Sequence, residues 1–138
     1  MGLDNGIILK LKEKTVPEDF PSMASLDKFD LENVMERGEL EIAYWRKCWG
    51  IREAIMGVLH MKDDGTTFEH SVDAEDCPAL RRALIKFLKP DYWEENADSI
   101  WEYDEYYEHM LDIILNLKWL EKRLKDHPDE TAYFYDSY

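Results

Sequence analysis

Hydrophobic and polar residues alternate along three stretches of this chain. Residues 6–12 read Gly-Ile-Ile-Leu-Lys-Leu-Lys, which places Ile7 and Leu9 on the same side of an extended chain. Residues 66–72 alternate in the same way, and the tail at residues 131–138 is rich in aromatic residues that favour strands. These patterns predict three strands, and we expect the C-terminal strand to lie beside the first.

Three other stretches carry hydrophobic residues at every third or fourth position, as in helices with one buried face. These stretches are residues 39–61, residues 80–89 and residues 99–124. The predicted buried stripe of the last includes Tyr107, Met110, Ile114, Leu117 and Leu124. Residues 13–38 contain two prolines and scattered charges, which predicts a long loop or an insertion with only a short helix at residues 30–37.

Together these elements predict an α+β fold. A small antiparallel sheet, made of the N-terminal, middle and C-terminal strands, packs against three main helices. The chain has 138 residues, which suits a single domain spanning residues 1–138.

The composition argues against several classes of protein. The net charge is −14, from 31 Asp and Glu against 17 Lys and Arg. This charge repels phosphate backbones and anionic lipid surfaces, so direct nucleic-acid binding is disfavoured. The sequence has no apolar run suited to a signal peptide or a membrane-spanning helix, which predicts a cytoplasmic protein without a membrane partner. Cys48 and Cys77 stand singly and are predicted to be reduced thiols.

Four motifs resemble those of a family of small uncharacterised proteins from tailed bacteriophages, prophages and gut bacteria. They are Gly2-Leu3-Asp4 before the first strand, Tyr-Trp-Arg-Lys at residues 44–47, Tyr-Asp-Glu-Tyr-Tyr at residues 103–107 and the aromatic run at residues 133–138. The resemblance implies a shared architecture, a phage or mobile-element origin and a location in the cytoplasm of a bacterial host. It brings no established activity and no cofactor.

The segment between Lys89 and Lys118 contains no basic residue. It holds nine carboxylates interleaved with six Trp and Tyr residues. Acidic and aromatic side chains together suit a basic groove on another protein, because rings bury area at low entropic cost. The sequence therefore predicts a binding site for a basic protein partner, composed of Trp93, Glu94, Glu95, Asp98, Trp101, Glu102, Asp104, Glu105, Glu108 and Asp112.

Two interpretations of this segment are open. In one, the carboxylates form only a solvated face and the rings belong to the core. In the other, the segment is an interaction surface, and carboxylates spaced like phosphates fill the nucleic-acid channel of a host defence nuclease. The preferred hypothesis is a non-catalytic interaction protein, with nucleic-acid mimicry as its narrower form.

The alternatives are an enzyme and a self-assembling protein. Glu105, Glu108, His109 and Asp112 share one helix face, so two or three of them could ligate a metal ion. A second group of acidic residues and histidines flanks the turn before the middle strand and could supply a general base or a ligand. It consists of His60, Asp63, Asp64 and His70. The chain lacks a nucleophile motif, a glycine-rich phosphate loop and a paired zinc signature, so no catalytic residue, metal site or cofactor is predicted. In a self-assembling protein, the acidic surface would meet the basic helix at residues 81–89 of another copy.

Three basic residues interrupt the apolar stretch at residues 39–61, namely Arg46, Lys47 and Arg52. Charged side chains are rarely buried unless they are paired. The sequence therefore predicts a buried or half-buried ion pair between Asp4 and Arg46, joining the start of the first strand to this stretch, with ligand binding by Arg46 as the alternative.

Overall fold

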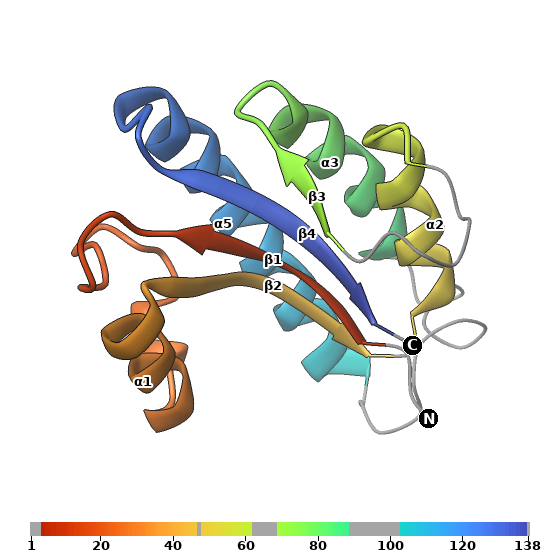
Figure 1. Ribbon diagram of the computed structural model, residues 1–138. Helices are drawn as coiled ribbons and strands as arrows, with labels where there is room; N and C mark the ends of the chain where they lie inside the picture. Colours follow the sequence, from red (N-terminus) through yellow and green to blue (C-terminus); the bar gives the residue numbers. More distant parts are fainter. Residues whose placement is uncertain (1–3, 47, 62–68, 89–102, 138) are drawn as a thin grey trace.

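Four strands and four α-helices form the described part of the chain (Figure 1). The computed structural model describes residues 4–46, 48–61, 69–88 and 103–137. In chain order the elements are β1 (Asp4–Lys10), the short 3-10 helix η1 (Met23–Ser25), α1 (Lys28–Arg37), β2 (Glu39–Arg46), α2 (Trp49–Val58), β3 (Glu69–Val72), α3 (Asp76–Ile85), the 3-10 helix η2 (Lys86–Leu88), α5 (Tyr103–Asp126) and β4 (Thr131–Ser137).

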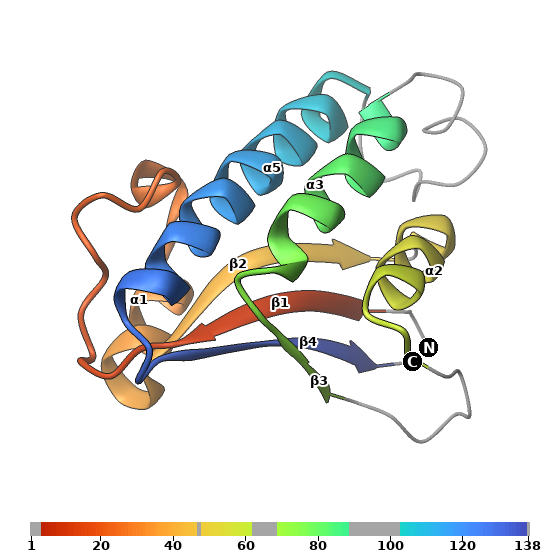
Figure 2. The same ribbon diagram turned by 90° about the horizontal axis from the view of Figure 1, so that it is seen from above.

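The strands form one antiparallel sheet in the order β2-β1-β4-β3. Helices α2, α3 and α5 lie on one side of this sheet (Figure 2). The predicted α+β fold with a small antiparallel sheet is therefore confirmed. The C-terminal strand β4 pairs with β1 along its whole length, as expected for a closing strand.

The prediction of one helix over residues 39–61 is wrong, because its first part is the edge strand β2 and α2 begins only at Trp49. A β-bulge explains the error. Ile7 pairs with Ala43 and Ile8 pairs with Glu41, which leaves Ile42 as an extra residue on β2. The extra residue turns an alternating pattern into helix-like spacings, since Ile42 and Trp45 are both buried and lie three positions apart. The sheet consequently has a fourth strand.

The longest helix, α5, supplies much of the core with a stripe that is rotated relative to the predicted one. Its fully or nearly buried hydrophobic residues are Tyr106, Met110, Ile113, Leu117 and Leu120. The sequence pattern placed Tyr107, Ile114 and Leu124 on this stripe with Met110 and Leu117. Apolar residues lie on both sides of Met110 around the helix, so their spacing in the sequence does not determine which side of α5 faces the core. The contact with the sheet determines it, because the indole nitrogen of Trp45 lies 3.3 Å from the sulfur of Met110.

The segment between β1 and β2 packs against the core through Phe20 and through Val34 of α1, which is 1% exposed. Phe20 is 3% exposed and meets Trp119 of α5 edge to face, with ring centroids 5.1 Å apart.

Helix α1 starts at a capping box in which the side chains of Asp27 and Asp30 accept hydrogen bonds from each other's backbone N–H groups. It ends at Gly38, whose φ of 67° is the left-handed conformation that glycine adopts without strain. The short helix expected at residues 30–37 is thus present.

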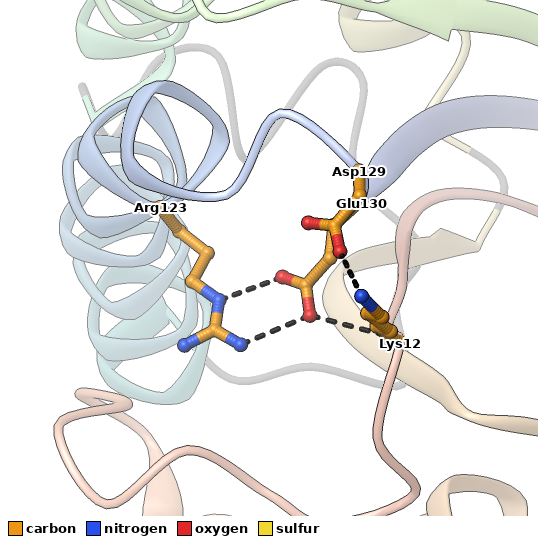
Figure 3. A network of polar contacts seen from close by, with 4 residues as sticks. All are labelled: Lys12, Arg123, Asp129 and Glu130. Atoms are coloured by element: carbon orange, nitrogen blue, oxygen red, sulfur yellow. Dashed lines mark hydrogen bonds and ion pairs between the residues drawn. The ribbon is translucent and has the colours of Figure 1, made fainter.

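A buried carboxylate ties the turn between α5 and β4 to the end of β1 (Figure 3). Glu130 accepts hydrogen bonds from Arg123 Nε at 2.7 Å, from Arg123 Nη2 at 3.0 Å and from the Lys12 backbone N–H at 3.1 Å. Lys12 Nζ also lies 2.9 Å from Asp129. Burial acts to raise the pKa of Glu130, but the bonds from Arg123 and Lys12 outweigh it and hold this pKa below its ordinary value. The network fixes the point at which β4 enters the sheet.

Candidate functional site

The predicted acidic binding segment falls partly outside the described residues. Trp93, Glu94, Glu95, Asp98, Trp101 and Glu102 all lie outside, and so does the side chain of Asp104. Glu105, Glu108 and Asp112 are exposed on α5. Among the described rings, Tyr106 points into the core and donates its hydroxyl to the Phe87 carbonyl at 2.7 Å, whereas Tyr107 is 38% exposed.

The predicted ion pair between Asp4 and Arg46 stays a prediction. The two residues are opposite each other in the β1–β2 register, but the Arg46 side chain is outside the described part, and the Asp4 carboxylate accepts a hydrogen bond from the Tyr44 hydroxyl at 2.8 Å. A buried ion pair is present elsewhere: Arg52 of α2 and Asp136 of β4 are each 3% exposed, and Arg52 Nη2 lies 2.8 Å from Asp136 Oδ2.

A pocket of about 170 Å³ lies at the free edge of β2, between α5 and the segment that contains η1 and the start of α1. We call it the acidic pocket because of its ionisable lining. Its ionisable lining residues are Asp30, Glu41, His109 and Asp112, and no Lys or Arg is among the described residues that line it. The remaining lining residues are Phe20, Ser22, Ser25, Leu26, Ile42, Ala43, Tyr44, Ile113 and Asn116.

Side chains of α5 fix the wall of this pocket by bonding backbone carbonyls of β2. Asn116 Nδ2 donates to the Ile42 carbonyl at 3.0 Å, and Ser22 Oγ donates to Asn116 Oδ1 at 2.9 Å. One ring nitrogen of His109, Nε2, lies 2.7 Å from the Tyr44 carbonyl, to which it donates when protonated at that atom. Burial lowers the pKa of His109, although its bond to the Tyr44 carbonyl and the charge of Asp112 act in the opposite direction. His109 therefore adds little positive charge to the acidic pocket near neutral pH.

Glu41 is the most perturbed carboxylate of the acidic pocket. Burial raises its pKa to about 7, and the charges of Asp30 and Asp27 act in the same direction. A carboxylate held among other carboxylates gains more than an isolated one when a cation approaches, because the cation relieves both repulsion and desolvation. The acidic pocket therefore suits a positively charged group.

A pH-dependent stability follows from this environment. The pKa of Glu41 rises from 4.5 to about 7 on folding, so the folded protein binds more protons than the unfolded chain between these pH values. Stability is then lost as the pH rises through this window. We expect Glu41→Gln to leave the free energy of unfolding nearly unchanged below pH 4.5 and to raise it by about 1 to 2 kcal/mol at pH 8. Urea unfolding followed by circular dichroism at both pH values measures the difference. An equal effect at both pH values would show that folding does not shift this pKa.

In the ranges that the structure describes, no three His, Cys, Asp or Glu side chains gather closely enough to hold a metal ion. Asp63 and Asp64, which the sequence groups with His60 and His70, are outside these ranges. His70 is half-buried and its Nδ1 lies 2.8 Å from the Ser71 carbonyl.

The sequence pointed to only part of the acidic pocket. Asp112 belongs to the predicted binding segment, whereas Glu41 and Asp30 were missed. The capping-box spacing of Asp27 and Asp30 is readable from sequence, but their approach to Glu41 depends on how α1 packs beside β2. Recognising residues 39–46 as a strand would have placed Glu39 and Glu41 together on one face.

Comparisons with known proteins identify no relative of this chain. No family model, no curated protein and no solved structure matches this chain. Among the described helices, none is both long enough and apolar enough to cross a bilayer.

Proposed function

We propose that this chain is a non-catalytic interaction protein that binds a basic protein partner through the acidic pocket. The observation that carries the proposal is the composition of the pocket's described lining, in which Asp30, Glu41 and Asp112 meet no Lys or Arg. A Lys or Arg side chain of the partner would enter the pocket and form charge-assisted hydrogen bonds with these carboxylates.

Exposed carboxylates on α5 extend the acidic pocket along the helix surface. Glu105, Glu108 and Asp112 lie at offsets of three, four and seven residues, which places them on one face of α5 with His109. With a rise of about 1.5 Å per residue, the row is roughly 10 Å long. We call it the acidic ridge, and it provides further contacts for a basic segment that has one side chain in the pocket.

The overall charge favours such a partner. A net charge of −14 creates a negative field that speeds the approach of basic proteins and repels acidic ones. Proteins that bind nucleic acids present basic grooves, so a nucleic-acid-binding enzyme is a suitable class of partner. Inhibition of a host defence nuclease by mimicry of its substrate is the narrower form of this proposal. It rests on the resemblance to phage and prophage proteins.

The self-assembly alternative has less support. It requires the basic helix at residues 81–89 to meet the acidic surface of another copy, but Arg81 is already engaged within the chain. Its Nη1 lies 3.0 Å from Glu121 Oε1. The enzyme alternative has less support from the acidic pocket, where the Ser22 hydroxyl donates to Asn116 Oδ1 at 2.9 Å and His109 Nε2 lies 2.7 Å from the Tyr44 carbonyl.

Calorimetric titration with an unstructured, Arg- and Lys-rich peptide tests the proposal. We expect binding to wild-type protein that weakens as salt is added, and no binding of an acidic peptide of equal length. Asp112→Asn is expected to weaken binding by about fivefold, since one charged contact at a rim is worth about 1 kcal/mol.

The matched control is Glu53→Gln. Glu53 is an exposed carboxylate on α2, away from the acidic pocket, and its substitution changes the net charge by the same amount. We expect it to alter binding less than twofold. If Asp112→Asn and Glu53→Gln weaken the peptide equally, binding responds only to total charge and the acidic pocket is not the site.

A further inference from the structure

The second face of the sheet carries a set of tyrosine and acidic side chains. Asn5, Ile7 and Leu9 of β1 are fully buried beneath the helices, so the alternate residues of β1 point to the other face. The strand register places six residues of the neighbouring strands on this other face, beside the alternate residues of β1. They are Glu39, Glu41 and Tyr44 from β2, Tyr133 and Tyr135 from β4, and Glu69 from β3. We call this surface the open face, because α2, α3 and α5 all lie on the opposite side (Figure 2).

The tyrosines of the open face are held in place. Tyr135 reaches across β1 above Gly6, where a β-carbon would lie only 2.9 Å from its ring and hydroxyl. Tyr133 donates its hydroxyl to Glu39 at 2.9 Å, and Tyr44 donates its hydroxyl to Asp4 at 2.8 Å. Burial raises the pKa of both Tyr133 and Tyr135, with the charges of Glu39 and Glu41 respectively acting in the same direction. Rings that are ordered in advance lose little entropy when a partner covers them.

The charge of the open face is negative. Its described carboxylates are Asp4, Glu39, Glu41 and Glu69. Its basic residues are Lys10, which lies 3.7 Å from Glu39, Arg37, which lines the groove beside α1, and Arg46, which is opposite Asp4 in the register. An antiparallel sheet commonly has one solvated face, and on this face tyrosine rings stand among carboxylates.

A groove of about 120 Å³ between α1 and the open face adds an apolar contact. It is lined by Ile8 of β1, by Glu39 and Glu41 of β2, and by Phe29, Asp30, Asn33 and Arg37 of the α1 region. Phe29 is 69% exposed, so its ring is accessible to a partner at the edge of the groove. Asp30 and Glu41 line both this groove and the acidic pocket, so the two features are adjacent.

We propose that the open face docks a basic amphipathic helix of the protein partner, with an apolar side chain in the groove beside Phe29 and Ile8. Its Lys and Arg side chains would lie against the carboxylates and tyrosine rings, which attract cations. An amphipathic helix is the suitable occupant because it can present an apolar residue to the groove and basic residues to the carboxylates at the same time. This inference rests on the proposed function, since it names the kind of basic segment that reaches Glu41.

Two peptides of identical composition test the inference. In one, Lys, Arg and Leu residues are ordered so that a helix has one apolar stripe and one basic face; in the other, the order is scrambled. We expect the amphipathic peptide to bind wild-type protein about tenfold more tightly, because only it can place a leucine in the groove.

Variants locate the binding surface. Phe29→Ser and Glu69→Lys are each expected to weaken binding of the amphipathic peptide by about fivefold. The controls Ile85→Ser on α3 and Glu53→Lys on α2 change exposed residues outside the open face and the acidic pocket, and they are expected to have effects below twofold. Circular dichroism of each variant verifies folding.

The outcomes separate this inference from the proposed function. If Phe29→Ser and Glu69→Lys bind like wild type while Asp112→Asn binds weakly, the open face is not the docking surface and the acidic pocket remains the site. If none of these variants changes binding, both proposals are wrong.

Discussion

Replacing Arg52 with methionine is expected to lower the free energy of unfolding by about 3 to 5 kcal/mol, the usual cost of leaving one member of a buried ion pair without its partner. Arg52 and Asp136 are each 3% exposed. Arg52 Nε lies 2.9 Å from both carboxylate oxygens, and Nη2 lies 2.8 Å from Oδ2. Without the guanidinium, the Asp136 carboxylate would be buried in the core with no compensating charge. Urea unfolding at pH 7 measures the loss.

Two further variants test the cause of this loss. In the double variant Arg52→Met with Asp136→Asn, the charge that would be stranded is gone, so we expect a smaller loss than the sum of the two single substitutions. Lys28→Met removes one member of the exposed pair with Glu32, where Lys28 is 92% exposed, and is expected to change stability by less than about 0.5 kcal/mol. A loss below about 1 kcal/mol for Arg52→Met would contradict the account of a buried, mutually dependent pair.

Replacing Gly6 with alanine is expected to destabilise the protein by about 3 kcal/mol, at the upper end of the cost of overpacking. A β-carbon at this position would lie 2.4 Å from the Ala43 carbonyl oxygen and 2.9 Å from the ring and hydroxyl of Tyr135. The first contact is with backbone of β2 next to the bulge, so side-chain rearrangement cannot relieve it. The expected consequences are a lower midpoint of thermal unfolding and weaker packing of Tyr135.

Gly57 provides the matched control for this substitution. A β-carbon on Gly57 would meet no atom within 4 Å, and the residue lies within α2. Gly57→Ala is therefore expected to raise stability by about 0.5 to 1 kcal/mol through helix propensity. If both glycine variants shifted the unfolding midpoint equally, close contact at Gly6 could not be the cause.

Sequence patterns predicted those elements whose signal is local. The alternation of Ile7 and Leu9 identified β1, and helical spacing identified α3 and α5. Strand β2 was assigned to a helix because one extra residue, Ile42, interrupts its alternation. A bulge depends on pairing with β1, so it is visible only once the partner strand is placed.

The residues of the candidate site divide in the same way, into those with a local signal in the sequence and those without one. Asp112, Glu105 and Glu108 were predicted because they lie close together in the sequence on one helix. Glu41 was missed because its environment comes from Asp27 and Asp30, which approach it only in the folded chain. The ion pair between Arg52 and Asp136 was not predicted, because the two residues are 84 positions apart in the sequence and no local pattern links them.

The central claim is that positive charge from a protein partner enters the acidic pocket. Its most direct test is an amide chemical-shift map of the wild-type protein during titration with the Arg- and Lys-rich peptide. We predict saturable shifts that are largest at Asp30, Glu41, His109 and Asp112, around the pocket wall. Shifts spread evenly over exposed carboxylates such as Glu53, or centred away from β2 and α5, would contradict the claim.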